Sequence, residues 1–173
     1  MLARSFLLLA LAFLAGCSPR FNWREVRSDD GFIALFPSRI ERDSRTVLLG
    51  KESANMTLTG AEVDHITFAV GVANFSDRAN MDQARVDYEN SLLANLKGAA
   101  PSRLSADNAL VASKARVQAD QLTVADAKLA VVARFAIRSN RVIEILVAAP
   151  VAIANDPKVK EARDTFFDSV QLF

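Results

Sequence analysis

The sequence predicts an α+β fold in which an antiparallel β-sheet is packed with a central and a C-terminal α-helix. Two segments, 66–72 and 129–137, alternate apolar residues with the period of two that a half-buried strand requires. Between them, apolar residues recur every three or four positions, as on one helix face: Met81, Ala84, Tyr88, Leu92 and Leu96. Strands, a helix, more strands, a second helix and a last strand are typical of α+β domains.

The first half of the sheet is expected from extended segments separated by turns. Asp30-Gly31 closes the first turn because glycine accepts a positive φ, and Gly50-Lys51 forms the second. Pro37 ends the strand before it, since proline cannot donate a ladder hydrogen bond. We expect these strands at 23–26, 32–36, 39–49 and 53–64.

The central helix is expected to start at a cap formed by Asn80 or Asp77 and to end at Gly98. Its charged residues lie mostly off the apolar stripe: Asp82, Arg85, Asp87, Glu89 and Lys97. Pro101 then begins a looser connection, and 114–122 is the next candidate strand.

A long hairpin follows, in which a turn at 139–141 joins the strand at 129–137 to a strand at 142–149. Both strands are rich in Val and Ile, which favours antiparallel pairing between neighbours. The face of the first strand opposite its apolar residues carries three cations: Lys128, Arg134 and Arg138.

The C-terminal helix is expected to be capped by Asn155 or Asp156, with Pro157 in the first turn, where a missing N–H costs nothing. Its buried stripe is formed by Val159, Ala162 and Phe166. Phe166 and Phe167 are not expected both to point inward from one stripe: one is expected under the edge of the sheet and the other in a groove, with burial in the core as the default. The last residues, 169–173, are expected to return as an edge strand.

The N-terminus has the features of a secretory signal. Arg4 supplies a positive charge, 6–15 contains only Phe, Leu and Ala, and small residues precede Cys17. A membrane-spanning helix needs roughly 20 apolar residues, so this run is too short for a stable transmembrane anchor. The alternative interpretation is an ordinary signal peptide in which Cys17 is incidental.

The tetrapeptide Leu14-Ala15-Gly16-Cys17 resembles the lipobox of bacterial lipoproteins. The resemblance implies that residues 1–16 are a signal peptide, that Cys17 is lipidated, and that acyl chains anchor the mature chain to a membrane. Ser18 stands where lipoproteins retained in the inner membrane typically carry Asp. In a Gram-negative host this implies the periplasmic face of the outer membrane. Because Cys17 is the only cysteine, the mature domain can form no internal disulfide.

The expected organisation is a lipidated tether at 17–22 and a single domain at 23–173, which is long enough to bury a substantial core. Without Arg4 the formal net charge of +1 falls to zero, so electrostatics give no case for nucleic acid. The sequence contains no Gly-rich phosphate loop, no Gly-x-Ser-x-Gly elbow and no metal-spaced His or Cys cluster. We therefore expect no cofactor and no metal.

The order of elements over 23–173 also resembles the PsbP/Mog-like fold, an α/β/α sandwich. The resemblance rests on an early strand ending at Pro37, a helix after the first meander, the long hairpin, and a terminal helix running into Phe166-Phe167-Asp168-Ser169-Val170-Gln171-Leu172. Proteins with this fold include extrinsic photosystem subunits and a nuclear-transport regulator. The resemblance therefore implies a scaffold or binding role without naming a partner.

His65 is the only histidine and the one candidate for acid–base chemistry, with Asp64 beside it and Glu62 nearby. A general base needs a nucleophile and an orienting partner, and no motif supplies either. We prefer the alternative, a strand-end histidine near a turn. Asp29-Asp30-Gly31 lacks the spaced oxygen ligands of a calcium loop and is also expected to be an ordinary turn.

Arg39, Arg42 and Arg45 recur every third residue in a segment that we expect to be extended. They form either a basic strip facing anionic headgroups or peptidoglycan carboxylates, or a solvated edge strand whose charges discourage pairing between sheets. We prefer the edge strand. Trp23 either rests at the membrane interface or covers the edge of the core, and we prefer the core.

These observations favour a membrane-anchored lipoprotein of the bacterial cell envelope that acts as a non-catalytic binding or accessory module. Its expected partners are the membrane, through the lipid anchor, and an envelope protein or a small apolar ligand. Two alternatives stay open: a carrier of small apolar molecules such as lipids, and an envelope hydrolase that uses His65.

Overall fold

The computed structural model describes residues 20–75, 80–96, 101–104 and 119–173. Over these residues, seven strands form an antiparallel sheet in the order β3-β4-β5-β9-β8-β7-β6, and three form a second sheet in the order β1-β2-β10. The large sheet contains β3 (Glu41–Leu49), β4 (Glu52–Val63), β5 (Ile66–Phe75), β6 (Ser102–Leu104), β7 (Asp120–Ala125), β8 (Leu129–Arg138) and β9 (Arg141–Pro150). The small sheet contains β1 (Arg24–Ser28), β2 (Phe32–Phe36) and β10 (Gln171–Leu172).

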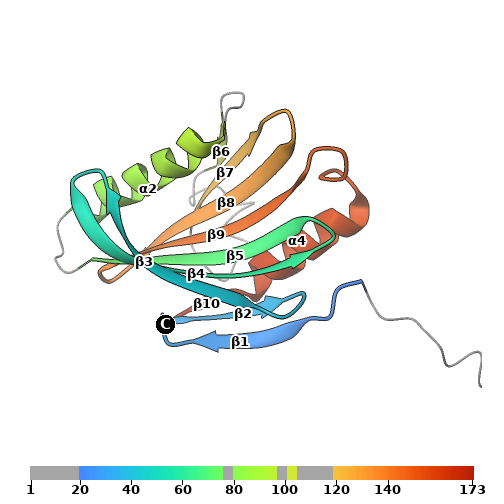
Figure 1. Cartoon of the computed structure of the whole chain (residues 1–173), viewed down its shortest axis with the longest axis horizontal. Coiled ribbons are helices and arrows are strands. Elements are labelled where there is room, and N and C mark those ends of the chain that lie inside the picture. The colour runs from blue at the N-terminus through green and yellow to red at the C-terminus, as the bar shows by residue number, and fades with distance from the viewer. Residues whose placement is uncertain (1–19, 76–79, 97–100, 105–118) are drawn as a thin grey trace, which may run out of the picture.

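Two helices cover opposite faces of the large sheet. Helix α2 (Met81–Asn95) packs on one face, while α4 (Pro157–Ser169) and the small sheet lie on the other (Figure 1). Each covered face has its own apolar cluster, one around Phe166 of α4 and one around Tyr88 of α2. The expected α+β fold, an α/β/α sandwich, is therefore confirmed.

Most expected elements are present with small shifts of their ends. Asn80 caps α2 by accepting from the backbone N–H of Gln83, and Asp156 caps α4 by accepting from that of Lys158. The expected end of α2 at Gly98 lies outside the described residues, and the helix ends before Leu96. The strand expected at 114–122 is β7, displaced toward the C-terminus, and 114–118 are not among the described residues.

Two features of the sheets differ from expectation. The short strand β6 pairs with β7 where a loose connection was expected, because three residues are too few to show a strand period. The N-terminal strands do not join the main sheet. Strand β2 pairs with β1 along one edge and with β10 along the other, and this closes a separate sheet.

The ring of Phe166 is the centre of the core between α4 and the sheets. It makes an edge contact with Phe36 of β2 at 5.3 Å and another with Phe68 of β5 at 5.5 Å between ring centroids. All three rings are fully buried. Because these side chains come from the small sheet, the helix and the large sheet, one aromatic cluster joins three layers of structure.

Phe166 and Phe167 are both buried in the core, as the default interpretation had it, although they do not share one stripe of the helix. Helix α4 is enclosed by both sheets, so a wider arc of its surface is covered than one apolar stripe. Phe167 lies over the guanidinium of Arg134, 4.3 Å from ring centroid to Cζ. Arg134 is on the polar face of β8, as expected, but that face is covered, and its Nε donates to Gln121.

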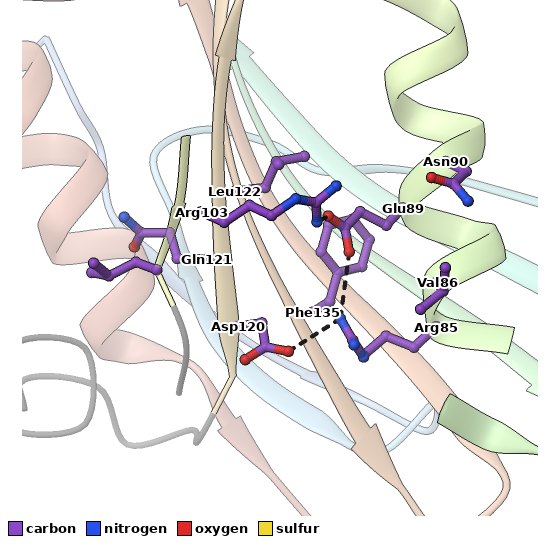
Figure 2. Close-up of a pocket in the computed structure, with 10 residues that line it drawn as sticks. Arg85, Val86, Glu89, Asn90, Arg103, Asp120, Gln121, Leu122 and Phe135 are labelled. Carbon is purple, nitrogen blue, oxygen red and sulfur yellow. Dashed lines mark hydrogen bonds and ion pairs between the residues drawn. The ribbon is translucent and has the colours of Figure 1, made fainter. Parts of the chain in front are cut away.

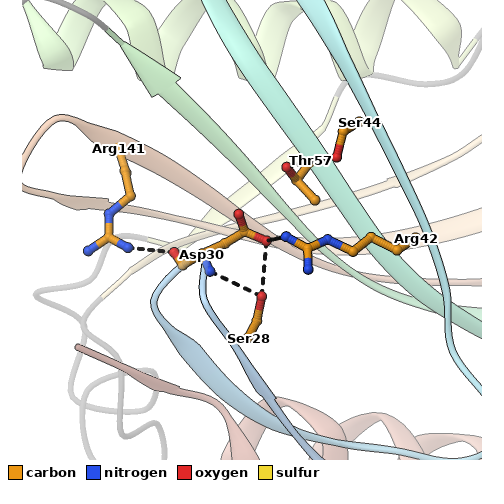
Figure 3. Close-up of polar contacts among 6 residues, drawn as sticks. All are labelled: Ser28, Asp30, Arg42, Ser44, Thr57 and Arg141. Atoms are coloured by element: carbon orange, nitrogen blue, oxygen red, sulfur yellow. Dashed lines mark hydrogen bonds and ion pairs between the residues drawn. The ribbon is translucent and has the colours of Figure 1, made fainter.

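Polar contacts around the β1–β2 turn join the small sheet to the large one (Figure 3). Asp30 accepts from Arg42 of β3 at 2.6 Å and from the hydroxyl of Ser28 at 2.9 Å, while Arg141 of β9 donates to the Asp30 carbonyl. Gly31 has a φ of 91° and lies against Arg141, so a side chain there would be strained and would collide. The Asp29-Asp30-Gly31 segment is thus a turn, and the Asp30 carboxylate binds Arg42.

The residues just before β1 also lie against the domain. Arg20 pairs with Asp64 at 2.7 Å, and the backbone N–H of Asn22 donates to Pro37. Phe21 and Trp23 both make edge contacts with Phe68, at 6.2 and 6.0 Å. Trp23 therefore covers the edge of the core, as preferred above, and the packed part of the chain begins before residue 23.

Replacing Phe166 with Ala is expected to lower the free energy of unfolding by about 3–5 kcal/mol, because it leaves a cavity among three layers. Urea unfolding followed by the fluorescence of Trp23, the single tryptophan, measures this. Phe173→Ala is the control, since that ring is 46% exposed and its loss should cost less than about 1 kcal/mol. Equal losses in the two variants would show that Phe166 is not central.

Candidate functional site

His65 lies where the preferred interpretation placed it, in the turn between β4 and β5. Both Asp64 and His65 have positive φ, 50° and 63°, as in a tight turn. The His65 side chain is 88% exposed, and its Nδ1 lies 3.6 Å from Oε1 of Glu62. The imidazole is exposed beside one exposed carboxylate and lies in a turn, which agrees with the interpretation of His65 as a strand-end histidine.

The three arginines at 39, 42 and 45 do not form one strip. Residues three apart in a strand point to opposite faces, so Arg42 and Arg45 lie on opposite sides of β3. Arg42 faces the small sheet and binds Asp30, whereas Arg45 lies on the α2 side beside Tyr88. Strand β3 is an edge strand with mostly exposed residues, which agrees with the edge-strand interpretation.

The most unusual side chain on the α2 side is Glu144, in the middle of β9. It is 5% exposed and is flanked in register by Gly71 of β5 and Phe135 of β8. Tyr88 of α2 lies above this row and makes an edge contact with Phe135 at 5.7 Å. A Cβ at Gly71 would collide with the Tyr88 hydroxyl, so the missing side chain makes room for the tyrosine.

Tyr88 and Glu144 form a buried polar pair with unused hydrogen-bonding capacity. Burial raises the pKa of Glu144 to about 7, although the nearby Tyr88 hydroxyl lowers it. Burial also raises the pKa of Tyr88 well above its ordinary value, and the charge of Glu144 adds to that rise. Among the described residues, Oε1 of Glu144 and the Tyr88 hydroxyl have no hydrogen-bond partner of ordinary geometry. The two side chains therefore interact electrostatically, without a well-aligned hydrogen bond between them.

An open hollow of about 460 Å³ lies over this pair, between α2 and the β3–β4 hairpin. We call it the Glu144 hollow. Residues of three kinds line it: polar groups from Glu144, Tyr88 and Asn95, apolar side chains from Met56 and Leu92, and the cation of Arg45. Its size is within the range of small-molecule sites, roughly 300–1,000 Å³.

A second hollow, of about 360 Å³, lies at the opposite side of α2 (Figure 2). Four charged side chains meet there, and we call them the Arg85 cluster: Arg85, Glu89, Arg103 and Asp120. Arg85 lies 3.4 Å from Glu89 and 3.1 Å from Asp120, and Arg103 contacts Glu89. These contacts join α2 to β6 and β7.

Glu89 is thus a correction to the sequence interpretation, which placed it off the buried stripe of the helix. It is 4% exposed because β6 and β7 extend the large sheet past the apolar stripe, so a second helix face is covered. Glu144 was not singled out at all. A detectable signal was present, since Glu144 is a lone acid inside the apolar run Val-Ile-Glu-Ile-Leu-Val of β9.

The remaining expectations concern the lipidation site, metal binding and membrane-spanning helices. Cys17 and the apolar leader are outside the described residues. In the described part of the chain, no three His, Cys, Asp or Glu residues are grouped so that they could hold a metal ion. None of the helices described is long and apolar enough to cross a bilayer.

No family model matches the chain, and no curated protein matches it in sequence. Among solved structures, the chain is similar to the solution structure of cyanobacterial PsbP (CyanoP) from Synechocystis sp. PCC 6803. The match covers 92% of this chain and 97% of that one, with a TM-score of 0.51 and 12% sequence identity. At this identity the likeness shows the fold alone: the chain has a PsbP-like fold, as the order of elements implied.

Replacing Glu144 with Gln is expected to flatten the pH dependence of stability. The folded chain holds a proton on Glu144 up to about pH 7, whereas the unfolded chain releases it near pH 4.5. The free energy of unfolding therefore falls as pH rises through this window, by roughly 3 kcal/mol from this group. Urea titrations between pH 4 and pH 8 should show that component in the wild type and not in Glu144→Gln.

Glu62→Gln is the matched control for that experiment, because the Glu62 side chain is 64% exposed on the same sheet. It should retain the component that Glu144 contributes to the wild-type profile. If the profiles of wild type and Glu144→Gln run parallel, Glu144 does not titrate as a buried acid.

Proposed function

We propose that this chain is a lipoprotein of the bacterial cell envelope, anchored through Cys17 and facing the periplasm from the outer membrane. The proposal rests on Leu14-Ala15-Gly16-Cys17 behind an apolar leader, and on Ser18 after the cysteine. Acyl chains on Cys17 would hold the chain far more firmly than a single myristoyl group, which is marginal alone.

The packing of the first described residues supports a close attachment. Three residues span at most roughly 10 Å, so Arg20 cannot lie farther than that from Cys17. Arg20 is paired with Asp64 in the β4–β5 turn, and Phe21 packs on the core. In the anchored protein, the end of the large sheet that carries this turn would therefore face the membrane.

The same module, in this proposal, acts by binding rather than by catalysis. The observation that carries this is the Glu144 hollow, an open site with a buried carboxyl and a buried hydroxyl at its base and free hydrogen-bonding capacity. Sites for small molecules characteristically combine apolar walls with a few convergent polar groups. Anchoring would place such a site at a fixed distance from the membrane, where it serves as an accessory to an envelope protein or captures a small ligand.

Replacing residues 1–17 with an ordinary cleavable signal followed by Ser is expected to release the chain into the soluble periplasmic fraction. The wild type should sediment with membranes, partition into detergent, and have the mass of a chain cut before Cys17 and carrying acyl groups. Fractionation and intact-mass measurement test this. A wild-type mass without acyl groups would contradict the anchor.

Ser18→Asp is expected to move the anchored chain from the outer to the inner membrane, since Asp at this position is typical of retained lipoproteins. Density-gradient separation of the two membranes measures the shift. Ser18→Ala is the control and should stay with the wild type. An unchanged distribution of the Asp variant would show that residue 18 does not sort this protein.

A further inference from the structure

The Glu144 hollow has groups of opposite charge at different depths. The Glu144 carboxyl and the Tyr88 hydroxyl lie buried at its base, between Gly71 and Phe135. Arg45 lines the hollow from β3, where its side chain is exposed, and its charge acts on Tyr88. Met56 of β4 and Leu92 of α2 supply partly buried apolar walls.

Neither Glu144 nor Arg45 forms an ion pair within the part of the chain that the structure describes. A buried carboxyl that lacks an ion-pair partner is costly to ionise, and a ligand that supplies a positively charged donor offsets that cost. Arg45 can bind a negatively charged group of the ligand, because a guanidinium binds a carboxylate through two parallel hydrogen bonds.

Other ligand chemistries fit this site less well. Among the residues that the structure describes, Glu144 is the only acid that lines the hollow, whereas Ca²⁺ takes six to eight oxygen ligands. A purely apolar ligand would bury the carboxyl further without pairing it. An anion alone would satisfy Arg45 and leave the base of the hollow unpaired. A molecule with both charges and an apolar body satisfies all three kinds of lining residue.

We infer that the Glu144 hollow binds a small zwitterion with an apolar body, of the class of free amino acids with aliphatic or aromatic side chains and their short peptides. The ligand ammonium donates to the Glu144 carboxylate, its carboxylate accepts from Arg45, and its side chain lies between Met56 and Leu92. Tyr88 lies beside Glu144 and packs against Phe135 next to it. This inference deepens the proposed function by naming the ligand class of the same site.

The test is calorimetric titration of the full-length lipidated chain in phospholipid nanodiscs. The probes are leucine, phenylalanine and dileucine, with N-acetyl-leucine lacking the ammonium and leucinamide lacking the carboxylate. At least one of the three zwitterions should bind, and each blocked leucine should bind at least about tenfold more weakly than leucine itself or not at all. Comparison of leucine with dileucine tells whether the site takes a free amino acid or a short peptide.

Two variants test which side chain of the protein binds each charged group of the ligand. Glu144→Gln should weaken the binding zwitterion at least about tenfold while leaving the weak binding of N-acetyl-leucine unchanged, since that probe has no ammonium. Arg45→Gln should likewise weaken the binding of the zwitterion, and it should leave the weak binding of leucinamide unchanged, because that probe has no carboxylate. The matched controls are Glu62→Gln, an exposed acid, and Arg42→Gln, on the opposite face of the same strand. Both should bind as the wild type does.

The inference is overturned if no zwitterion binds at concentrations up to about 10 mM, if blocked and free leucine bind equally, or if binding survives Glu144→Gln. Co-elution of the chain with the nanodiscs shows, in the same preparation, whether the chain is attached to the membrane. Loss of binding with intact attachment therefore rejects the ligand class without rejecting the anchor. Attachment that fails while the zwitterion still binds rejects the anchor alone.

Discussion

The contact between Phe166, Phe36 and Phe68 is the constraint on which the rest of the fold depends. It joins α4, the small sheet and the large sheet, and Phe21 and Trp23 extend it toward the N-terminal end of the domain. With α4 held between two sheets, both aromatic residues of its last turns are buried, and Arg134 is covered by Phe167. A separate contact, the ion pair between Asp30 and Arg42 of the edge strand, joins the small sheet to the large one. The α4 side of the large sheet is therefore filled, mostly by apolar side chains.

The α2 side is built differently, because Gly71 leaves space in the middle of the sheet and Tyr88 fills only part of it. Glu144 is buried in this space without an ion pair in the described part of the chain, and its Oε1 has no hydrogen-bond partner there, so its burial is costly. The Arg85 cluster on the other side of α2 shows the contrasting arrangement, in which a buried acid is matched by two arginines. Natural proteins violate the rule of satisfied buried polar groups mainly where function requires it. That contrast is why the Glu144 hollow, and not the Arg85 cluster, is the candidate site.

Much of the fold follows from local signals. Gly31 and Gly50 occupy turns with positive φ, Pro37 follows β2, and Asn80 and Asp156 cap the helices, and each of these depends only on neighbouring residues. The candidate site was far less predictable. Glu144, Tyr88 and Arg45 come from three elements widely separated in the chain, and no short motif links them. The lone acid in β9 marks an anomaly, but the register of β5 and β9 is needed to bring Gly71 beside it.

The sequence by itself determined the type and order of the elements, the turns and caps between them, and the α+β class, since propensity and periodicity act over a few residues. Only the tertiary structure decided which faces are covered. Periodicity separates the two faces of a strand or helix, but burial depends on what packs against each face. Residues distant in sequence decide that, and this is why Arg134 and Glu89 are buried on faces expected to be polar. The separation of β1, β2 and β10 into their own sheet has the same origin, because pairing between strands is a long-range choice.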